Sequence, residues 1–324
     1  MSLRLTRRIA MGTENIRNIG IVGAGTIGAS WATFFATKGF KVKMFDVSET
    51  ILTEAHRKAK ENLDSLVGYG LIEQTDSDKF KENISQVKDL GGLTDGVEYI
   101  QESTLESYDV KKPLYAELDE LTDPSVILAS SSSGLLMTQI QQAAKHPERC
   151  LIAHPFNPPH LIPLVELVPG ERTDPAIVDD VKVFFEKLDK VPVVLKKEAQ
   201  GHIANRLAAA LWREAIDIVL QGVATVEDVD KALYAGPGIR WALMGQHLIY
   251  HLGGGTGGYG YFIDHIGKAF GSYWKEMATW SEISDESRDM LVKGVEESIG
   301  DKTIEELSKW RDNKIVDLLK VIYE

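Results

Sequence analysis

A histidine, an asparagine and a glutamate lie near one another in the sequence, in a pattern that suits proton transfer. His154 ends the apolar run CLIAH, Asn157 follows in HPFNPP, and Glu166 lies in the apolar stretch PLVELVPG. Histidine is well suited to exchanging a proton near neutral pH, and oxidising an alcohol requires a base for the hydroxyl proton while hydride leaves the carbon. A carboxylate in an apolar run needs a polar partner, so we predict that Glu166 orients His154. The alternative is a histidine that only fills space, but the surrounding prolines indicate a rigid, specified loop.

Polar side chains also follow a second apolar run. Four serines, residues 130–133, end the predicted strand SVILASS. Ligands of an open parallel sheet bind beyond the carboxyl ends of its strands, so the hydroxyl of Ser133 can hold a substrate oxygen. Alternatively, Ser132 or Ser133 caps the helix that is expected from about residue 135. Asn205 lies in GHIANRL at the start of another predicted helix, where it can reach into a cleft between domains or be an ordinary polar residue of a helix start.

A glycine-rich motif, GAGTIG, stands between a predicted strand over 18–23 and a predicted helix over 26–38. In that context the glycines permit a tight turn, close approach of a pyrophosphate and packing of helix on strand, while the helix N-terminus attracts the phosphates. Asp46 ends the next strand and can accept both ribose hydroxyls, which favours NAD over NADP. The alternative is a plain strand–helix turn with a solvent-facing aspartate. The predicted cofactor contacts are Gly23, Gly25, Thr26, Ile27, Gly28 and Asp46.

Alternating strands and helices must position these residues. Strands are predicted over 18–23, 41–46, 98–103, 125–131, 150–154, 163–170 and 191–195, and the main helices over 26–38, from a cap at Ser48, and over 107–121, 135–145 and 175–189. This alternation indicates a parallel sheet covered on both faces. From about residue 201 the pattern is helical, apart from a glycine-dense loop at 252–262. We therefore predict a flexible leader at 1–17, a Rossmann-type doubly wound α/β domain at 18–198 and an all-α domain at 199–324.

Composition excludes several classes of partner. The chain has 324 residues and a net charge of −12, which argues against nucleic acid because phosphate binding needs a basic surface. No apolar run is long enough for a membrane span, and Cys150 is the single cysteine. A lone cysteine in a predicted buried strand fits a reducing compartment, so we predict a cytoplasmic protein with no membrane partner. No metal site is predicted.

Together these motifs resemble the 3-hydroxyacyl-CoA dehydrogenase family, from NIGIVGAGTIG through ASSSSGLL, HPFNPP and PLVELVPG to GHIANRL. The resemblance implies NAD as cofactor, His154 as base and Glu166 as its partner. It also implies that Ser133 and Asn205 contact the substrate oxygen and that Ser133 and Asn157 lie at the nicotinamide side. Glu106 and Lys111 would be cofactor contacts, although the residues alone favour a solvated, charged helix start. The family usually has Asn-Thr-Ser where this chain has residues 131–133, Ser-Ser-Ser.

The substrate is less closely defined. GPGIRWALMGQHLIYHLGGG, residues 236–255, resembles the small-substrate branch of that family, which includes L-gulonate 3-dehydrogenase (lambda-crystallin type) and L-carnitine dehydrogenase. Because a guanidinium can bind a carboxylate through two hydrogen bonds, Arg240 either binds the substrate or pairs with an Asp or Glu at the domain or subunit interface.

Two other interpretations are a different substrate and a protein without catalytic activity. The alternative substrate is a 3-hydroxyacyl-CoA, which would need a basic patch for its phosphates; EAHRKAKEN, 54–62, has some Lys and Arg and does not decide between the two. A non-catalytic protein that keeps the fold is a further alternative. Amphipathic helices of the second domain predict a homodimer.

Overall fold

The computed structural model describes residues 15–323, which form two compact units. Unit 1 ends at Arg206 and unit 2 begins at Leu207, so the division falls within helix α8 (Ala204–Leu220). Most of the predicted leader, 1–17, lies outside the described residues. The first strand begins at Asn18, as predicted.

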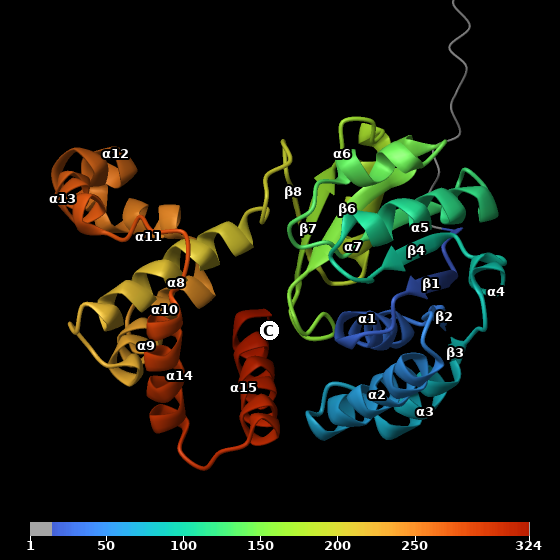
Figure 1. Cartoon of the computed structure of the whole chain (residues 1–324), viewed down its shortest axis with the longest axis horizontal. Helices are drawn as coiled ribbons and strands as arrows, with labels where there is room; N and C mark the ends of the chain where they lie inside the picture. The colour runs from blue at the N-terminus through green and yellow to red at the C-terminus, as the bar shows by residue number, and fades with distance from the viewer. Residues whose placement is uncertain (1–14, 324) are drawn as a thin grey trace, which may run out of the picture. The chain divides into compact units, whose positions relative to one another are not determined.

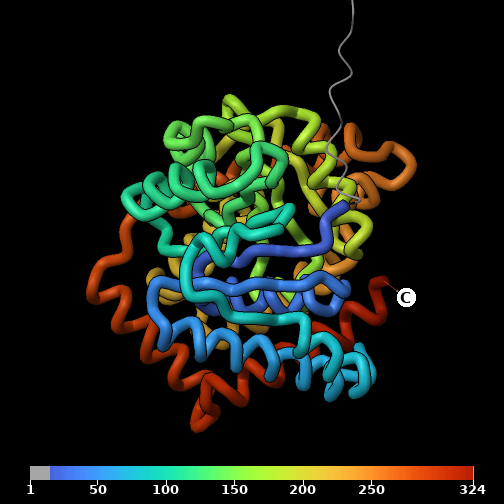
Figure 2. Tube along the Cα trace, turned by 90° about the vertical axis from the view of Figure 1, so that its right-hand side faces the viewer, coloured from blue at the N-terminus to red at the C-terminus, as the bar shows by residue number. Residues whose placement is uncertain are grey.

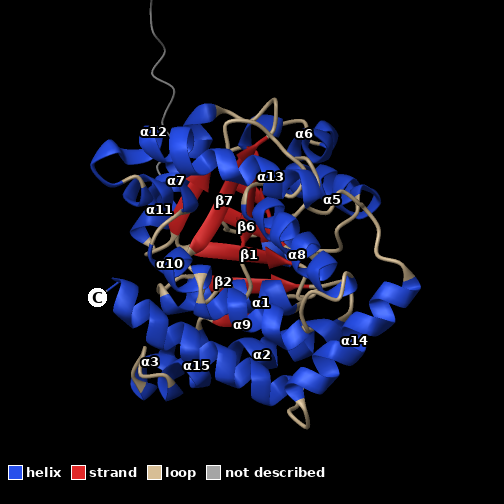
Figure 3. Ribbon diagram, turned by 90° about the vertical axis from the view of Figure 1, so that its left-hand side faces the viewer, coloured by secondary structure: helices blue, strands red, loops and turns tan. Residues whose placement is uncertain are grey.

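Unit 1 is built on one eight-stranded sheet with the strand order β3-β2-β1-β4-β5-β6-β7-β8. Figure 3 draws its strands in red, with β1, β2, β6 and β7 labelled. The strands are β1 (Asn18–Val22), β2 (Lys41–Phe45), β3 (Ile84–Gln86), β4 (Tyr99–Glu102), β5 (Ile127–Ser130), β6 (Cys150–Pro155), β7 (Leu164–Pro169) and β8 (Val191–Val194). The chain winds outward from β1 in one direction and from β4 in the other. The carboxyl ends of these two neighbours therefore mark the place where open sheets of this kind bind ligands. The predicted doubly wound α/β domain is confirmed, although the short strand β3 was not foreseen.

The sheet is not wholly parallel, which corrects one expectation. β6 and β7 pair antiparallel, whereas the other neighbours pair in parallel. The connection between β6 and β7, residues 156–163, contains no helix. A connection this short cannot make the crossover that parallel neighbours need, so the chain turns back on itself.

Helices cover both faces of the sheet (Figures 1 and 2). They are α1 (Thr26–Thr37), α2 (Glu49–Gly68), α3 (Gln74–Glu82), α4 (Leu90–Thr94), α5 (Tyr108–Leu121), α6 (Met137–Ile140) and α7 (Pro175–Lys187). Ser48 caps α2 as predicted, since its hydroxyl accepts from the Ile51 N–H. The helix predicted over 135–145 is shorter, consisting of α6 and one 3-10 turn, Gln141–Ala143.

Two apolar layers hold these helices to the sheet. On one face, Trp31 of α1 stacks on Phe35 and contacts Phe185 of α7, with ring centroids 5.2 and 5.8 Å away. On the other face, residues of α5 and α6 pack with Ile100 and Leu128 of the strands. Burying apolar residues on both faces fixes the sheet edge where the polar side chains lie, which is how the core positions the site.

Unit 2 is entirely helical where the structure describes it (Figure 1), which confirms the predicted all-α second part. Its helices after α8 are α9 (Val226–Ala235), α10 (Pro237–Leu243), α11 (Gln246–Gly253), α12 (Gly258–Phe262), a π-helical turn (Ile263–Gly267), α13 (Lys268–Glu276), α14 (Asp285–Ile299) and α15 (Ile304–Tyr323). The prediction of a loop at 252–262 is wrong, because these residues form helical turns despite their glycines. Among the described helices, none has the length and apolarity to cross a bilayer.

Candidate active site

His154 and Glu166 face each other across the antiparallel pair of β6 and β7, where they are register partners. His154 Nδ1 lies 2.9 Å from Glu166 Oε2, and both side chains are buried. An ionised carboxylate can only accept, so the hydrogen is assigned to Nδ1 and the Nε2 lone pair is left free. This arrangement presents an oriented proton acceptor at the end of β6.

The second oxygen of Glu166 is held by the start of α8. Oε1 accepts hydrogen bonds from the backbone N–H groups of Ile203 at 2.9 Å and Ala204 at 3.0 Å. Burial raises the pKa of Glu166, but the hydrogen bond from His154 and the two backbone donors outweigh it, so the net pKa is lowered. Glu166 therefore remains a carboxylate and keeps the tautomer of His154 fixed.

The connection between β6 and β7 is tied down on both sides. The Lys190 ammonium donates to the carbonyls of Pro159 and Ile162, the latter at 2.8 Å, and lies 4.2 Å from the Phe34 ring centroid. The His160 N–H donates to the Ser30 hydroxyl at 3.0 Å. These anchors account for the rigid loop that the prolines predicted.

Asn157 lies in this loop and precedes a cis peptide bond to Pro158. Its side chain is exposed and makes no hydrogen bond with the described residues. It is therefore open to a ligand, as a nicotinamide contact would have to be.

The loop after β5 presents Ser133 to solvent. The Ser132 hydroxyl accepts from the Leu135 N–H at 3.0 Å within the loop. The capping alternative is wrong, because α6 begins only at Met137, after Leu136, and has no side-chain cap. Ser133 is exposed, and its hydroxyl has only a distant contact, 3.4 Å, with Glu106. Asn205 Nδ2 donates to the Ser133 carbonyl at 3.4 Å, so the structure brings these two predicted residues together. The Ser133 hydroxyl is thereby left available to a ligand.

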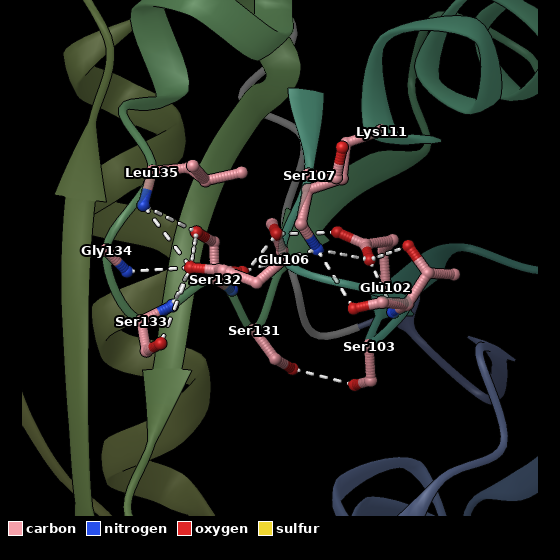
Figure 4. A network of polar contacts seen from close by, with 12 residues as sticks. Glu102, Ser103, Glu106, Ser107, Lys111, Ser131, Ser132, Ser133, Gly134 and Leu135 are labelled. Atoms are coloured by element: carbon pink, nitrogen blue, oxygen red, sulfur yellow. Dashed lines mark hydrogen bonds and ion pairs between the residues drawn. The ribbon is translucent and has the colours of Figure 1, made fainter. Parts of the chain in front are cut away.

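Glu106 and Lys111 belong to one polar network (Figure 4). Lys111 Nζ lies 2.6 Å from Glu102 Oε1, and both side chains are 1% exposed. Glu106 Oε1 accepts from the Ser132 hydroxyl at 2.7 Å and from the N–H groups of Ser133 and Gly134 at 2.9 and 2.8 Å. A solvated helix start is therefore wrong for Lys111, which is buried with Glu102. Glu106 is exposed, but it also holds the serine loop (residues 131–135) in place.

Hydrogen bonding also decides the charge of Glu106. Burial raises its pKa, but the bonds from Ser132, from Gly134 and from Leu135, together with the nearby Lys111 ammonium, outweigh that effect, and the net pKa is lowered. Glu106 is therefore an anion that accepts from the serine loop.

Sequence reasoning missed Glu102 and the role of Ser131. Glu102 ends the apolar strand β4, which is the same signal that drew attention to Glu166. The Ser131 hydroxyl is bonded to Trp31 Nε1 at 3.1 Å, to Gln101 Nε2 at 2.7 Å and to the Ser103 hydroxyl at 2.8 Å. No sequence pattern singled out Ser131 from its neighbours, since its partners come from α1 and from the end of β4, both far away in the chain.

The glycine motif forms a cradle suited to a dinucleotide. A Cβ on Gly23 would lie 2.6 Å from the Ser103 backbone, and one on Gly28 would lie 2.1 Å from the Gly23 carbonyl oxygen. Gly25 and Thr26 are exposed, and a Cβ on Gly25 would meet nothing within 4 Å. The first turn of α1, which includes Thr26 and Ile27, has no acidic residue and no side-chain cap. Its free N–H groups can bind a phosphate.

Asp46 lies beside this cradle. Its Oδ2 accepts from the Ala24 N–H at 2.8 Å and its Oδ1 from the Ser48 N–H at 2.9 Å. Each oxygen keeps a further lone pair for a ribose hydroxyl. The residues present therefore fit NAD.

In unit 2, Arg240 is exposed, and its guanidinium forms no hydrogen bond or ion pair with the described residues. Its neighbour Trp241 donates through Nε1 to Gln246. The Arg240 guanidinium therefore has no ion-pair partner among the described residues of unit 2.

Known proteins match the chain along most of its length. The family model of the 3-hydroxyacyl-CoA dehydrogenase NAD binding domain matches residues 18–199, and that of the C-terminal domain matches 201–294. An L-carnitine dehydrogenase of Streptomyces coelicolor is 39% identical over 307 residues, 95% of each chain.

Two solved structures also resemble this one. An NAD⁺-dependent dismutase, 5-formyl-3-hydroxy-2-methylpyridine 4-carboxylic acid 5-dehydrogenase, has a TM-score of 0.80 and 27% identity, covering 95% of this chain and 99% of that one. A 3-hydroxybutyryl-CoA dehydrogenase of Escherichia coli K12 has a TM-score of 0.68 and 27% identity, covering 86% and 57%.

Proposed function

The chain belongs to the 3-hydroxyacyl-CoA dehydrogenase family, and we propose that it oxidises the 3-hydroxyl of a small free 3-hydroxy acid, with His154 as general base. The predicted family, NAD as cofactor and a dehydrogenase acting on a CH–OH group are confirmed by the matches. The base and the substrate are our proposal. It is carried by one observation: Glu166 holds His154 Nδ1, so that Nε2 is free to accept a proton.

The roles of the site residues follow from their contacts. His154 Nε2 takes the hydroxyl proton, and Glu166 stabilises the imidazolium that results. The exposed Ser133 hydroxyl and the Asn205 amide, which share one small region, contact the substrate oxygen. Bound NAD supplies the hydride acceptor.

The cofactor is assigned to the residues of the cradle and its neighbours. The pyrophosphate lies against Gly25, Thr26 and Ile27, while Gly23 and Gly28 give the turn its shape. Asp46 accepts from the adenosine ribose. Asn157 is at the nicotinamide. We assign Glu106 to the nicotinamide ribose side, which it can reach because a second oxygen, Oε2, is free of the serine loop. Lys111 is 1% exposed and supports this site from within, through its ion pairs with Glu102 and Glu106.

A free acid is favoured over a CoA thioester by two observations. The L-carnitine dehydrogenase of Streptomyces coelicolor matches over 95% of the chain, and Arg240 is an unpaired guanidinium that can bind a carboxylate. In α2, Arg57 is neutralised by Glu54, whose Oε2 lies 2.9 Å from its Nε, and by Glu61. One of the three basic side chains of residues 54–62 is therefore already engaged by carboxylates.

The second candidate is a 3-hydroxyacyl-CoA dehydrogenase. It is favoured by the likeness to the Escherichia coli 3-hydroxybutyryl-CoA dehydrogenase, which covers 86% of this chain. The base and cofactor residues would keep their roles, and only the substrate would differ.

NADH absorbance separates the two candidates. We expect turnover with L-carnitine or L-gulonate and NAD, and little with 3-hydroxybutyryl-CoA. His154→Ala should reduce kcat by at least about a hundredfold while NADH binding stays within twofold. His146→Ala, at a half-buried histidine of the same unit that lies beside Glu148, is the matched control and should retain activity. A His154→Ala enzyme with wild-type turnover would contradict the assigned base.

We further propose a cytoplasmic homodimer formed through unit 2. Many of its large apolar side chains are exposed, including Leu207 at 68% and Trp212 at 61%. Among its described apolar residues the buried ones are Ile216, Ile249, Phe262, Ala278 and Val316. Such a surface is costly in water unless a second copy covers it. Sedimentation should give the mass of a dimer, and Trp212→Glu should shift it toward the monomer.

A further inference from the structure

A second histidine lies against the proposed base. The rings of His202 and His154 have centroids 5.2 Å apart and planes inclined by 57°. His202 is only 1% exposed, so it has been withdrawn from water although it is polar. Burying an imidazole costs free energy unless its nitrogens are bonded, which means that this position serves a purpose beyond filling space.

The backbone of His202 is also unusual. Its φ is +52°, in the left-handed region that few residues other than glycine adopt. Gly201 before it has a φ of +76°, so the chain makes two successive left-handed steps. These steps turn the following N–H groups, those of Ile203 and Ala204, onto Glu166. His202 is thus part of the turn that orients the carboxylate.

The imidazole joins this turn to the serine loop. Nε2 of His202 lies 3.0 Å from the Ser132 carbonyl oxygen, and a carbonyl only accepts, so the hydrogen is assigned to Nε2. Nδ1 is buried and has no hydrogen-bond partner among the described residues. His202 therefore packs its ring against His154 and donates a hydrogen bond to Ser132, the residue before Ser133. In the chain it lies immediately before the two N–H groups that bind Glu166.

From these contacts we infer that His202 is a positioning residue, which fixes the Ser133 loop relative to the His154–Glu166 pair. The inference rests on the proposed function, because that function requires the Ser133 hydroxyl and His154 Nε2 to meet the same substrate oxygen. A displacement of about 1 Å of the Ser133 hydroxyl relative to His154 Nε2 can lower the rate on the order of a hundredfold. Most of the residues assigned to NAD, the glycine motif and Asp46 among them, lie outside this loop, so we expect NAD binding to change little when His202 is replaced.

Two substitutions distinguish the hydrogen bond from the bulk of the ring. His202→Phe keeps the ring and removes the donor, whereas His202→Gln places an amide N–H near the position of Nε2. For the best 3-hydroxy acid substrate, we expect His202→Phe to lower kcat at least about tenfold, with KM for NAD within twofold. His202→Gln should recover most of the loss. Equal kcat values for the two variants, or wild-type kcat for His202→Phe, would overturn the inference.

A second measurement does not depend on turnover. In amide hydrogen exchange, His202→Phe should speed exchange at residues 133–135 by about tenfold or more, and His202→Gln should not. If His202→Phe does not fold, His202→Asn replaces it, since Asn tolerates the left-handed region and its amide is too short to reach Ser132. If hydrogen exchange at residues 133–135 is unchanged in His202→Phe, or in His202→Asn where that replaces it, His202 does not position the serine loop. Absence of turnover in the wild type, with the exchange result as expected, would instead refute the proposed function alone.

Discussion

His154 and Glu166 are paired because β6 and β7 run in opposite directions, which places them directly opposite each other with Nδ1 2.9 Å from Oε2. Had β7 been parallel to β6, residues so close in the chain could not have met across the pair. The antiparallel direction of β7 therefore places Glu166 where it can orient His154, the proposed base. Replacing the carboxylate tests this relationship directly.

Glu166→Gln should lower kcat/KM by about 10²- to 10⁴-fold, because the amide no longer enforces the Nδ1–H tautomer or stabilises an imidazolium. NADH affinity should stay within twofold, as Glu166 is remote from the glycine cradle in the proposed roles. Steady-state kinetics and NADH fluorescence titration provide the two readings. Undiminished turnover would show that His154 needs no carboxylate.

Two glycines of the cradle should respond differently to alanine. Gly28→Ala should lower the free energy of unfolding by roughly 2 kcal/mol or more, because its Cβ would lie 2.1 Å from the Gly23 carbonyl oxygen. Gly25→Ala should leave stability nearly unchanged, since its Cβ meets open space, but should raise KM for NAD by obstructing the pyrophosphate. Urea unfolding and initial-rate kinetics measure the two effects. Normal NAD binding by Gly25→Ala would contradict the assignment of Gly25 to the pyrophosphate.

Asp46→Asn should alter the choice of cofactor. Losing the carboxylate weakens the acceptor for the ribose hydroxyls and removes the charge that repels a 2′-phosphate. We expect KM for NAD to rise by about tenfold and the ratio of kcat/KM for NADP to that for NAD to increase. A ratio that does not move would mean that Asp46 only supports the Ala24 and Ser48 backbone.

Arg240→Met tests recognition of the free acid. Losing a charge-assisted hydrogen bond costs about 1.5–3 kcal/mol, so KM for the 3-hydroxy acid should rise roughly tenfold or more. Arg288→Met, at an exposed arginine of α14, removes the same charge and should leave KM unchanged. A KM for Arg240→Met within about twofold of wild type would refute the carboxylate contact.

Lys190 makes the stability of the loop between β6 and β7 dependent on pH. Burial, with a smaller effect of the nearby Lys38 ammonium, lowers the pKa of Lys190 to about 7, although the carbonyls of Pro159 and Ile162 favour the charged form. The unfolded chain, with an ordinary lysine pKa of 10.5, binds more protons between these values, so the contribution of Lys190 to stability rises with pH across that window.

Comparison with Lys190→Met isolates this contribution. The unfolding free energy of wild type minus that of Lys190→Met should become more positive between about pH 6 and about pH 9, by up to a few kcal/mol. Urea unfolding of both proteins at each pH gives the difference. A constant difference would indicate that Lys190 keeps the same charge in both states.

The sequence by itself determined the features that depend on neighbouring residues. The GAGTIG turn between a strand and a helix, with Asp46 ending the next strand, predicted the dinucleotide fold, because each piece has a local backbone requirement. An acidic residue in an apolar run likewise predicted a buried, partnered Glu166. The helical character of the second part was equally evident from periodicity.

Only the tertiary structure decided contacts between segments far apart in the chain. It ran β7 antiparallel to β6 and buried Lys111 against Glu102. It also placed the start of α8 on Glu166 and packed His202 against His154. Each outcome depends on which surfaces the sheet brings together and on the need to satisfy every buried charge and N–H group there. Local sequence cannot encode that choice, because the partner of a buried polar atom is fixed by the packing of the whole unit.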